Sequence, residues 1–210
     1  MWLMRSKNVF GAAALALVLG ACMNLKMYEG ADAGYLVASL AMGTDSTYGN
    51  VQFDFRNRDG SVDSYLFWVN DAAVLGPVAD FHSANGKGGI ATVRLKPGQY
   101  EFYSFGVKSS DLDYAPRAAY SVPFTIEGGK TTYVGEFLTL GLPRKGLFGN
   151  EISGAPYFVV SNQQARDIAL ASAKAPELAR FPVIAAVPDP TSLHVPYFQP
   201  APLPRGQATP

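Results

Sequence analysis

The stretch Thr92–Phe105, TVRLKPGQYEFYSF, contains the pattern on which the predicted fold rests. Both of its halves are rich in the β-branched and aromatic residues that favour strands. Lys96-Pro97-Gly98-Gln99 separates the halves and supplies the backbone conformations that a tight connection needs. We therefore expect two strands here, joined by a turn.

Eight segments along the chain have this strand-forming composition, with turn residues between them. They are Tyr35–Ala41, Val51–Arg56, Ser64–Val69, Ile90–Leu95, Tyr100–Phe105, Tyr120–Ile126, Thr131–Leu140 and Tyr157–Val160. Asn57-Arg58-Asp59-Gly60 and Glu127-Gly128-Gly129-Lys130 provide further tight turns. No long helical pattern separates the strands. We predict a mainly β domain over residues 35–187, an antiparallel β-sandwich of about seven to nine strands.

Two of these strands are apolar on both faces, whereas a sheet with one face in water alternates apolar and polar residues. In one of them Tyr65 and Phe67 alternate with Leu66 and Trp68. The segment YEFYSF of the opening stretch has the same character. We expect another element to cover the second face of these strands.

One helix is expected near the end of this domain, over residues 162–174. Ser161-Asn162-Gln163-Gln164 has the Ser-x-x-Gln spacing of a capping box, and a weakly apolar stripe follows it through Lys174. Pro176 limits any extension. We expect this helix to pack on the sandwich or beside it, followed by a last strand at Val183–Val187.

The strand–Pro-Gly–strand unit of residues 92–105 resembles that of transthyretin-like and carboxypeptidase-regulatory-like sandwich modules in bacterial envelope proteins. The resemblance covers fourteen residues, and its motif is mostly hairpin chemistry. It implies the sandwich fold and carries no active site with it.

The N-terminal residues have the order of a secretory signal. Two cations, Arg5 and Lys7, precede the apolar run Val9–Gly20. A helix over this run would reach only about 18 Å, which is short of the ~30 Å hydrocarbon core of a bilayer. We therefore expect residues 1–21 to be a signal peptide rather than a membrane span.

Leu19-Gly20-Ala21-Cys22 resembles the lipobox of bacterial lipoproteins. Small residues let a peptidase approach the Ala21–Cys22 bond, and the thiolate of Cys22 is the nucleophile that accepts a diacylglyceryl group. The resemblance implies cleavage after Ala21 and a Cys22 that carries S-diacylglycerol and an N-acyl chain such as palmitate. Residues 22–34 would then form a lipidated tether. The alternative is an ordinary signal peptide with a chance cysteine beside its cleavage site.

Residue 23 is Met rather than the Asp that commonly retains such lipoproteins at the inner membrane. The resemblance therefore implies the outer membrane, with the domain facing the periplasm. Removing Arg5 and Lys7 from the seventeen basic residues leaves fifteen against seventeen acidic residues. Lipid rather than a polybasic patch would hold this chain at the membrane. The charge balance also argues against a nucleic-acid partner.

The sequence contains no pattern typical of a catalytic site. It has no G-x-S-x-G or S-x-x-K motif, and its histidines are His82, expected in an exposed loop, and His194. A zinc site needs several His or Cys ligands. Asn85-Gly86-Lys87-Gly88-Gly89 leads into a strand, whereas a phosphate-binding loop leads into a helix. We therefore expect a protein that is not an enzyme and has no cofactor.

A weak calcium signal lies in residues 57–63, where Asn57, Asp59 and Asp63 place oxygen ligands at alternate positions. The loop lacks a Glu at its twelfth position, and Asp-Gly between strands is typical of a hairpin. Calcium is therefore the weaker interpretation of this loop, and no other metal site is expected.

Two functions remain open on the sequence alone. The first is a non-enzymatic envelope lipoprotein whose domain contacts another envelope protein or a cell-wall component. The second is a ligand-binding module, for example for glycans, in which Tyr103, Tyr114 or Tyr120 stacks on sugar rings. The alternative for these rings is a place in the core.

Residues 188–210 include seven prolines and are expected to form an extended, mobile tail. The alternative is a partner-binding segment anchored by Tyr197 and Phe198.

Overall fold

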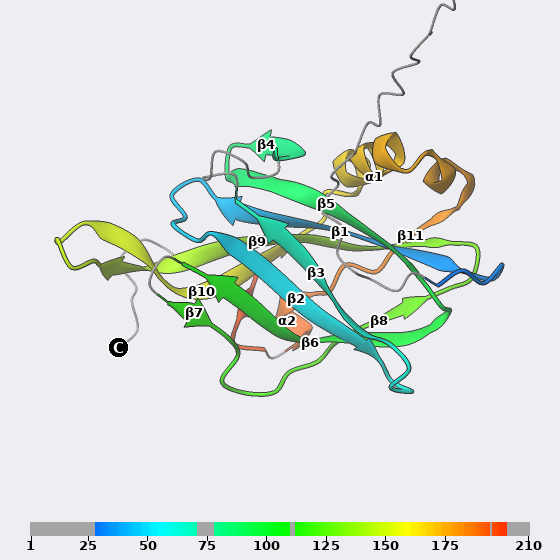
Figure 1. The fold of residues 1–210 in the computed structure, drawn as a ribbon, viewed down its shortest axis with the longest axis horizontal. Helices are drawn as coiled ribbons and strands as arrows, with labels where there is room; N and C mark the ends of the chain where they lie inside the picture. Colours follow the sequence, from blue (N-terminus) through cyan, green and yellow to red (C-terminus); the bar gives the residue numbers. More distant parts are fainter. Residues whose placement is uncertain (1–27, 71–77, 110–111, 194, 201–210) are drawn as a thin grey trace, which may run out of the picture.

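The computed structural model describes residues 28–70, 78–109, 112–193 and 195–200, and it is mainly β, with 54% strand and 12% helix. Two sheets contain all the described strands (Figure 1). The expectation of a mainly β fold is therefore confirmed.

The larger sheet has seven strands and mixed strand directions. Its order is β12-β10-β9-β1-β5-β4, and β11 also pairs with β9. The pairs β1–β9, β9–β11 and β10–β12 are parallel, and the others are antiparallel. Its strands are β1 (Gly34–Gly43), β4 (Phe81–Ser83), β5 (Gly86–Leu95), β9 (Thr131–Lys145), β10 (Glu151–Ser161), β11 (Val183–Ala185) and β12 (Phe198–Gln199).

The smaller sheet has five strands, and all of its pairs are antiparallel. Its order is β3-β2-β6-β7, with β8 also paired to β6. Its strands are β2 (Asn50–Asn57), β3 (Asp63–Val69), β6 (Gly98–Lys108), β7 (Asp113–Tyr114) and β8 (Val122–Ile126).

All eight strand segments expected from the sequence overlap observed strands, and Val183–Val187 contains β11. The expectation of a wholly antiparallel arrangement is wrong for the larger sheet. There β1 and β9, which are far apart in the sequence, lie side by side and run in the same direction. The two- and three-residue strands β4, β7 and β12 were not expected, because strands this short show no alternation in the sequence.

The Pro-Gly connection of the opening stretch does not close a hairpin. Residues 96–97 lead from β5 in the larger sheet to β6 in the smaller sheet, and residues 127–130 likewise lead from β8 to β9. Of the three tight turns expected from the sequence, the one after Asn57 joins neighbouring strands of one sheet, β2 and β3. Gly60 and Gly129 have φ values of 73° and 66°, so these turns do need the positive φ that glycine tolerates. Turn composition predicts that the chain reverses, but not which sheet receives the next strand.

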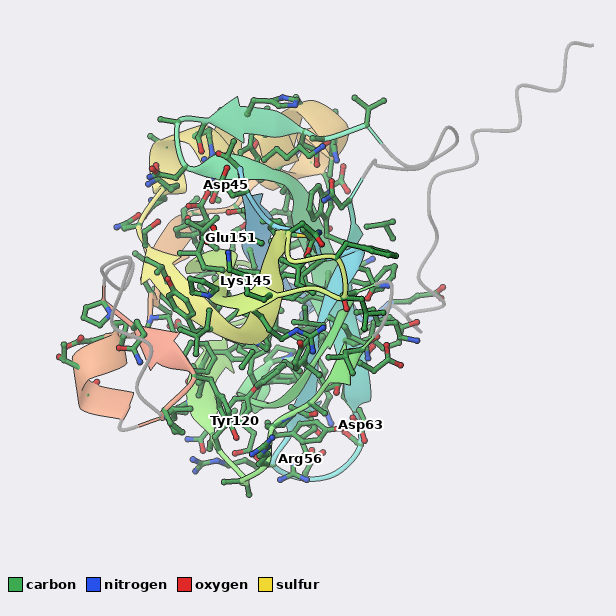
Figure 2. The ribbon with its side chains drawn as sticks, turned by 90° about the vertical axis from the view of Figure 1, so that its left-hand side faces the viewer. Asp45, Arg56, Asp63, Tyr120, Lys145 and Glu151 are labelled. Atoms are coloured by element: carbon green, nitrogen blue, oxygen red, sulfur yellow. The ribbon has the colours of Figure 1, made fainter. Side chains whose placement is uncertain are left out.

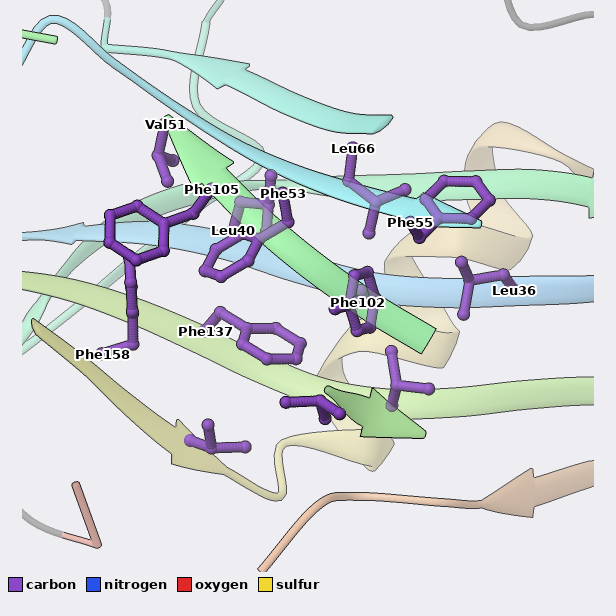
Figure 3. Packing of buried hydrophobic residues seen from close by; sticks show 14 of the residues in the cluster. Leu36, Leu40, Val51, Phe53, Phe55, Leu66, Phe102, Phe105, Phe137 and Phe158 are labelled. Atoms are coloured by element: carbon purple, nitrogen blue, oxygen red, sulfur yellow. The ribbon is translucent and has the colours of Figure 1, made fainter. Parts of the chain in front are cut away.

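The two sheets share one hydrophobic core, rich in phenylalanine (Figure 3). The ring centroid of Phe53 on β2 lies 4.9 Å from that of Phe137 on β9 and 4.7 Å from that of Phe158 on β10. Buried and less buried residues alternate along β2 and β8, so each of these strands turns one face to the core. The core therefore lies between the two sheets.

The helix α1 (Gln164–Lys174) covers the outer face of the larger sheet, against β1, β5 and β9. With the following 3₁₀ helix η1 (Pro176–Arg180) it completes a second apolar cluster, around Val37, Tyr133 and Ala171. The helix expected over residues 162–174 is thus present. It does not cover β3 or β6, the strands for which a cover was expected. No helix in the described part of the chain is long and apolar enough to span a membrane.

The expected capping box is not formed. The N-cap residue of α1 is Gln163, and it makes no side-chain capping hydrogen bond. The hydroxyl of Ser161 instead donates a 3.3 Å hydrogen bond to Glu136 Oε1, and Asn162 Oδ1 accepts one from the backbone N–H of Gln164. The hydroxyl of Ser161 therefore pairs with a carboxylate on β9 instead of a helical N–H.

The expectation of a mobile tail does not hold for the described residues after Pro188. This segment forms the short helix α2 (Pro190–Leu193) and then β12, which pairs with β10. Phe198 is 3% exposed, and its ring lies 5.5 Å from that of Phe158. The hydroxyl of Tyr197 accepts hydrogen bonds from the backbone of residues 117 and 118. Both aromatic side chains thus pack against the domain itself. The high proline content of the segment did not predict this packing.

Candidate functional site

The expected lipidation residue Cys22 and the Ala21–Cys22 bond lie outside the described residues, as do the signal segment and His194. The last part of the expected tether is described, and it is fixed to the domain. The backbone N–H of Tyr28 donates to the carbonyl of Arg94 on β5, and Arg94 Nη2 donates to the carbonyl of Gly30. Residue 28 therefore already belongs to the folded part of the chain.

His82 is exposed as expected, but it lies in β4 rather than in a loop, opposite Lys87 on β5. The glycines of residues 86–89 begin β5. A Cβ atom at Gly86 or Gly88 would lie 2.1–2.2 Å from a carbonyl oxygen of β1. Close packing of β5 against β1 thus accounts for Gly86 and Gly88, and a Cβ atom at Gly89 would meet the side chain of Trp68, so no phosphate is needed to explain these glycines.

The oxygen atoms of the weak calcium candidates are engaged in hydrogen bonds with their neighbours. Asn57 Oδ1 accepts from the backbone of Val62, and Asp59 Oδ1 accepts from that of Ser61. The hydrogen bonds from Ser61 lower the pKa of Asp59. Asp63 Oδ1 accepts a 2.8 Å hydrogen bond from the hydroxyl of Tyr103. Residues 57–62 form the expected hairpin turn, whereas the carboxylate of Asp63 is bound to Tyr103 on β6 and not to the turn. Within the described ranges, no three His, Cys, Asp or Glu side chains cluster as a metal site would require.

The three aromatic candidates do not form a common platform. Tyr114 on β7 packs edge-on against the buried Tyr48, at 6.1 Å between centroids. Tyr120 lies between Phe105 and Phe198 at the edge of the core. Its hydroxyl is buried without a hydrogen-bond partner among the described residues, and burial raises its pKa. Of these three candidates, Tyr103 alone lies on an open sheet face.

That open face is the outer face of the smaller sheet. Tyr65 and Phe67 on β3 extend from it with their rings 6.5 Å apart and nearly perpendicular, and Tyr65 is 38% exposed. The strand register places Asp54 of β2 opposite Tyr65 and Gln52 opposite Phe67. The sequence indicated these rings through the two-sided apolar pattern of β3, although it predicted that they would be covered.

Charged groups border the aromatic rings of this face. The guanidinium of Arg56 lies 4.5 Å from the centre of the Tyr103 ring and 2.9 Å from Glu101 Oε1. Ser121 donates a 2.5 Å hydrogen bond to Glu101 Oε2. In Figure 2, Arg56 and Asp63 lie near each other at one end of the molecule, and Tyr103 contacts both of them.

The protonation states of this border follow from its contacts. The hydrogen bond from Ser121, with a further contribution from Arg56, lowers the pKa of Glu101. Burial, with the hydrogen bond to Asp63, raises the pKa of Tyr103 to about 12. At neutral pH Glu101 is therefore an anion and Tyr103 a donor. Because Arg56 covers one side of the Tyr103 ring, Tyr65 and Phe67 offer the more accessible aromatic surface. We name Tyr65, Phe67, Tyr103, Arg56 and Glu101 the open aromatic face.

A second polar cluster, which the sequence did not predict, lies under α1. Asp167 is fully buried and accepts hydrogen bonds of 2.6–2.7 Å from Ser39, Tyr133 and Arg166. Arg166 also pairs with Glu136 at 2.6 Å, and its guanidinium lies 3.6 Å from the centre of the Phe81 ring. The hydroxyl of Ser39 is held by a carboxylate and is inaccessible to substrate. These residues join α1 to β1 and β9, and the cluster is a structural one.

No family model matches the chain, and no curated protein matches its sequence. Among solved structures, a leucine-rich repeat protein from Bacteroides thetaiotaomicron VPI-5482 is similar over 51% of this chain, with 14% sequence identity and a TM-score of 0.32. The chain spans only 14% of the length of that protein. Similarity at this level carries no conclusion about fold or function.

Proposed function

We propose that this chain is a lipid-anchored binding module of a bacterial cell envelope. In this proposal Cys22 carries the lipid, and the open aromatic face binds another envelope protein or a cell-wall component. The accessible rings of Tyr65 and Phe67, on a sheet face that α1 does not cover, are the observation that carries the proposed binding role. Localisation at the outer membrane, facing the periplasm, is part of the same proposal.

We also propose that the domain is a β-sandwich of the transthyretin-like kind. The shared core of the two sheets supports this arrangement, because residues from β1, β9 and β10 contact residues from β2 and β6 within one cluster. The expected strand–turn–strand unit would then connect the two layers rather than form a hairpin within one of them.

The described start of the domain supports a short connection to the membrane. Residue 28 is already bound to β5, so five residues lie between it and Cys22. The six steps from one Cα atom to the next over this stretch span at most about 21 Å when fully extended. A lipid on Cys22 would therefore hold this end of the domain close to the bilayer. A binding role is favoured over catalysis because the polar groups of the open aromatic face pair with one another beside the accessible rings.

The anchor is tested by the intact mass and membrane fractionation of the wild-type protein beside Cys22→Ala. We expect a lipid-sized mass increment and membrane retention in the wild type, and neither in the variant. A wild-type protein that is soluble and has no added mass would show that the anchor is wrong.

The binding role is tested by placing a photo-crosslinking residue at Tyr65 in cells. The matched control places the same residue at Ala169, which is exposed on α1 and lies over the other sheet. We expect a reproducible crosslinked partner from position 65 that is absent from position 169. Equal capture at both positions, or no capture at position 65, would contradict the proposed face.

Glycan binding remains the second candidate because Tyr65 and Phe67 offer accessible rings next to polar side chains. This version replaces Tyr114 and Tyr120, which lie at the core, with the two residues of β3. Co-sedimentation with purified peptidoglycan distinguishes it from a protein partner. Retention that Tyr65→Ala abolishes would support the glycan, and retention that persists in this variant would exclude this site.

A further inference from the structure

The most exposed large apolar side chains in the described residues lie at the tip of the β9–β10 hairpin. Leu147 and Phe148 are each 97% exposed. They belong to the turn between Lys145, which ends β9, and Glu151, which begins β10. Figure 1 shows this hairpin projecting at one end of the molecule. Because the folded domain buries almost none of their surface, these two side chains contribute little to its core.

The backbone of the tip is hydrogen-bonded within the turn. The N–H of Gly146 donates to the carbonyl of Asn150 at 2.8 Å, and the N–H of Gly149 donates to the carbonyl of Gly146 at 3.0 Å. Gly149 has a φ of 76°, a conformation that favours glycine. Backbone groups that are paired in this way can leave water at a lower cost than unpaired ones.

Positive charge lies directly beside the apolar tip. Arg144 and Lys145 come just before it, and Glu151 follows it at 3.4 Å from the ammonium group of Lys145. This pairing balances one cation and leaves the stem of the hairpin with a net positive charge. An apolar tip with cations at its base matches the boundary between acyl chains and anionic lipid headgroups.

We propose that Leu147 and Phe148 enter the surface of an anionic lipid bilayer and form a second membrane contact. This inference rests on the proposed anchor at Cys22, which supplies the first contact. The parallel pairing of β1 with β9, with Tyr35 opposite Thr131, places the tip at the opposite end of the larger sheet from the tether. The fifteen residues of β9, from Thr131 to Lys145, span about 45–50 Å. Two contacts this far apart hold the domain with its long axis along the membrane.

The test uses the full-length protein purified from membranes and reconstituted into vesicles of phosphatidylethanolamine and phosphatidylglycerol. Cys22 is the only cysteine of the chain, and the proposed lipid blocks its thiol. Asn150→Cys therefore provides a single site for a fluorescent label beside an intact tip. Nitroxide groups on the lipids quench a label that lies at the bilayer. We expect strong quenching, and quenching about fivefold weaker after Leu147→Ser combined with Phe148→Ser.

The double variant with serine at positions 147 and 148 should keep the fold, because both replaced side chains are almost fully exposed. Circular dichroism checks that this variant is folded. Equal quenching in both proteins, or none in either while the protein stays on the vesicles, would overturn the second contact and leave the anchor unaffected. If Cys22 carries no lipid, the anchor is wrong, and the label is placed in a Cys22→Ala background mixed with the same vesicles. Loss of quenching in the double variant then still supports the tip, and absence of quenching refutes it.

Discussion

The outer faces of the two sheets use the same chemical group in opposite settings. On the larger sheet, the guanidinium of Arg166 lies over the Phe81 ring and pairs with the buried carboxylates of Glu136 and Asp167. On the smaller sheet, the guanidinium of Arg56 lies over the Tyr103 ring and pairs with Glu101, but half of the Arg56 side chain is exposed. The first arrangement is closed by α1, whereas the second faces water.

This difference separates stability from recognition. A buried charge that loses its partner is costly, so the network under α1 holds the helix in place. An exposed ion pair contributes little to stability, because water and salt screen it. The open aromatic face can therefore change without loss of the fold, which is what a binding surface requires. Four predictions test this contrast.

Asp167→Ala should cause the largest loss of stability. The substitution removes the acceptor for Ser39, Tyr133 and Arg166, and we expect it to lower the free energy of unfolding by about 3–5 kcal/mol. For a chain of this size that corresponds to a melting temperature lower by about 10 °C or more. Thermal and urea unfolding measure the effect, with Asp113→Ala, an exposed carboxylate on β7, as the control. A loss as small as that of the control would show that the network does not hold α1.

Arg166→Ala and Arg56→Ala form a matched pair that tests the two settings directly. Loss of Arg166 leaves Glu136 and Asp167 without their cation, and we expect a destabilisation of about 2–3 kcal/mol. Loss of Arg56 from the exposed pair should cost less than about 1 kcal/mol. Urea unfolding at one pH and ionic strength gives both values. Equal losses would contradict the distinction between a closed and an open face.

The sequence predicted the strands because each has its own composition, but it could not predict contacts between distant residues. Asp167 follows Arg166 in a helix, a pattern that is typical of a solvated surface. Its partner Ser39 lies 128 residues away, and nothing local marks the two as neighbours. Assignment of β5 and β6 to different sheets depends in the same way on long-range packing.

The candidate site was predicted only in part for the same reason. Aromatic residues on both faces of β3 were visible in the sequence, but whether a helix covers Tyr65 or leaves it open depends on the tertiary fold. Tyr114 and Tyr120 have the same composition signal as Tyr103, yet they pack at the core edge. Phe198 illustrates the converse, since its ring fills the core from a proline-rich segment.

Tyr65→Ser should affect binding more than stability. Because Tyr65 is 38% exposed, we expect the free energy of unfolding to fall by about 1 kcal/mol or less. Capture of the partner, by a crosslinking residue placed at the neighbouring Phe67, should be lost. A variant that keeps its partner would exclude Tyr65 from the binding surface, and one that unfolds would show that the open face is part of the core.

The smallest effect should be the pH dependence of Glu101→Gln. The pKa of Glu101 lies below its ordinary value of 4.5 in the folded protein, mainly because Ser121 donates a hydrogen bond to the carboxylate. A lowered pKa means that Glu101 stabilises the fold above the unfolded-state pKa, and that this contribution is lost as the pH falls through the folded-state pKa. The free energy of unfolding of the wild type should therefore exceed that of the variant by less than about 1 kcal/mol at pH 7, and this difference should shrink as the pH falls.

Urea unfolding from pH 7 downwards measures this difference, and Ser121→Ala provides the control background. Because the hydrogen bond from Ser121 is the largest cause of the lowered pKa, Glu101→Gln should have a smaller and less pH-dependent effect in that background. A difference that stays constant on acidification would mean that Glu101 contributes by packing rather than by charge. The polar residues of the open aromatic face would then resemble the buried polar cluster under α1, where close packing rather than solvent-exposed charge determines stability.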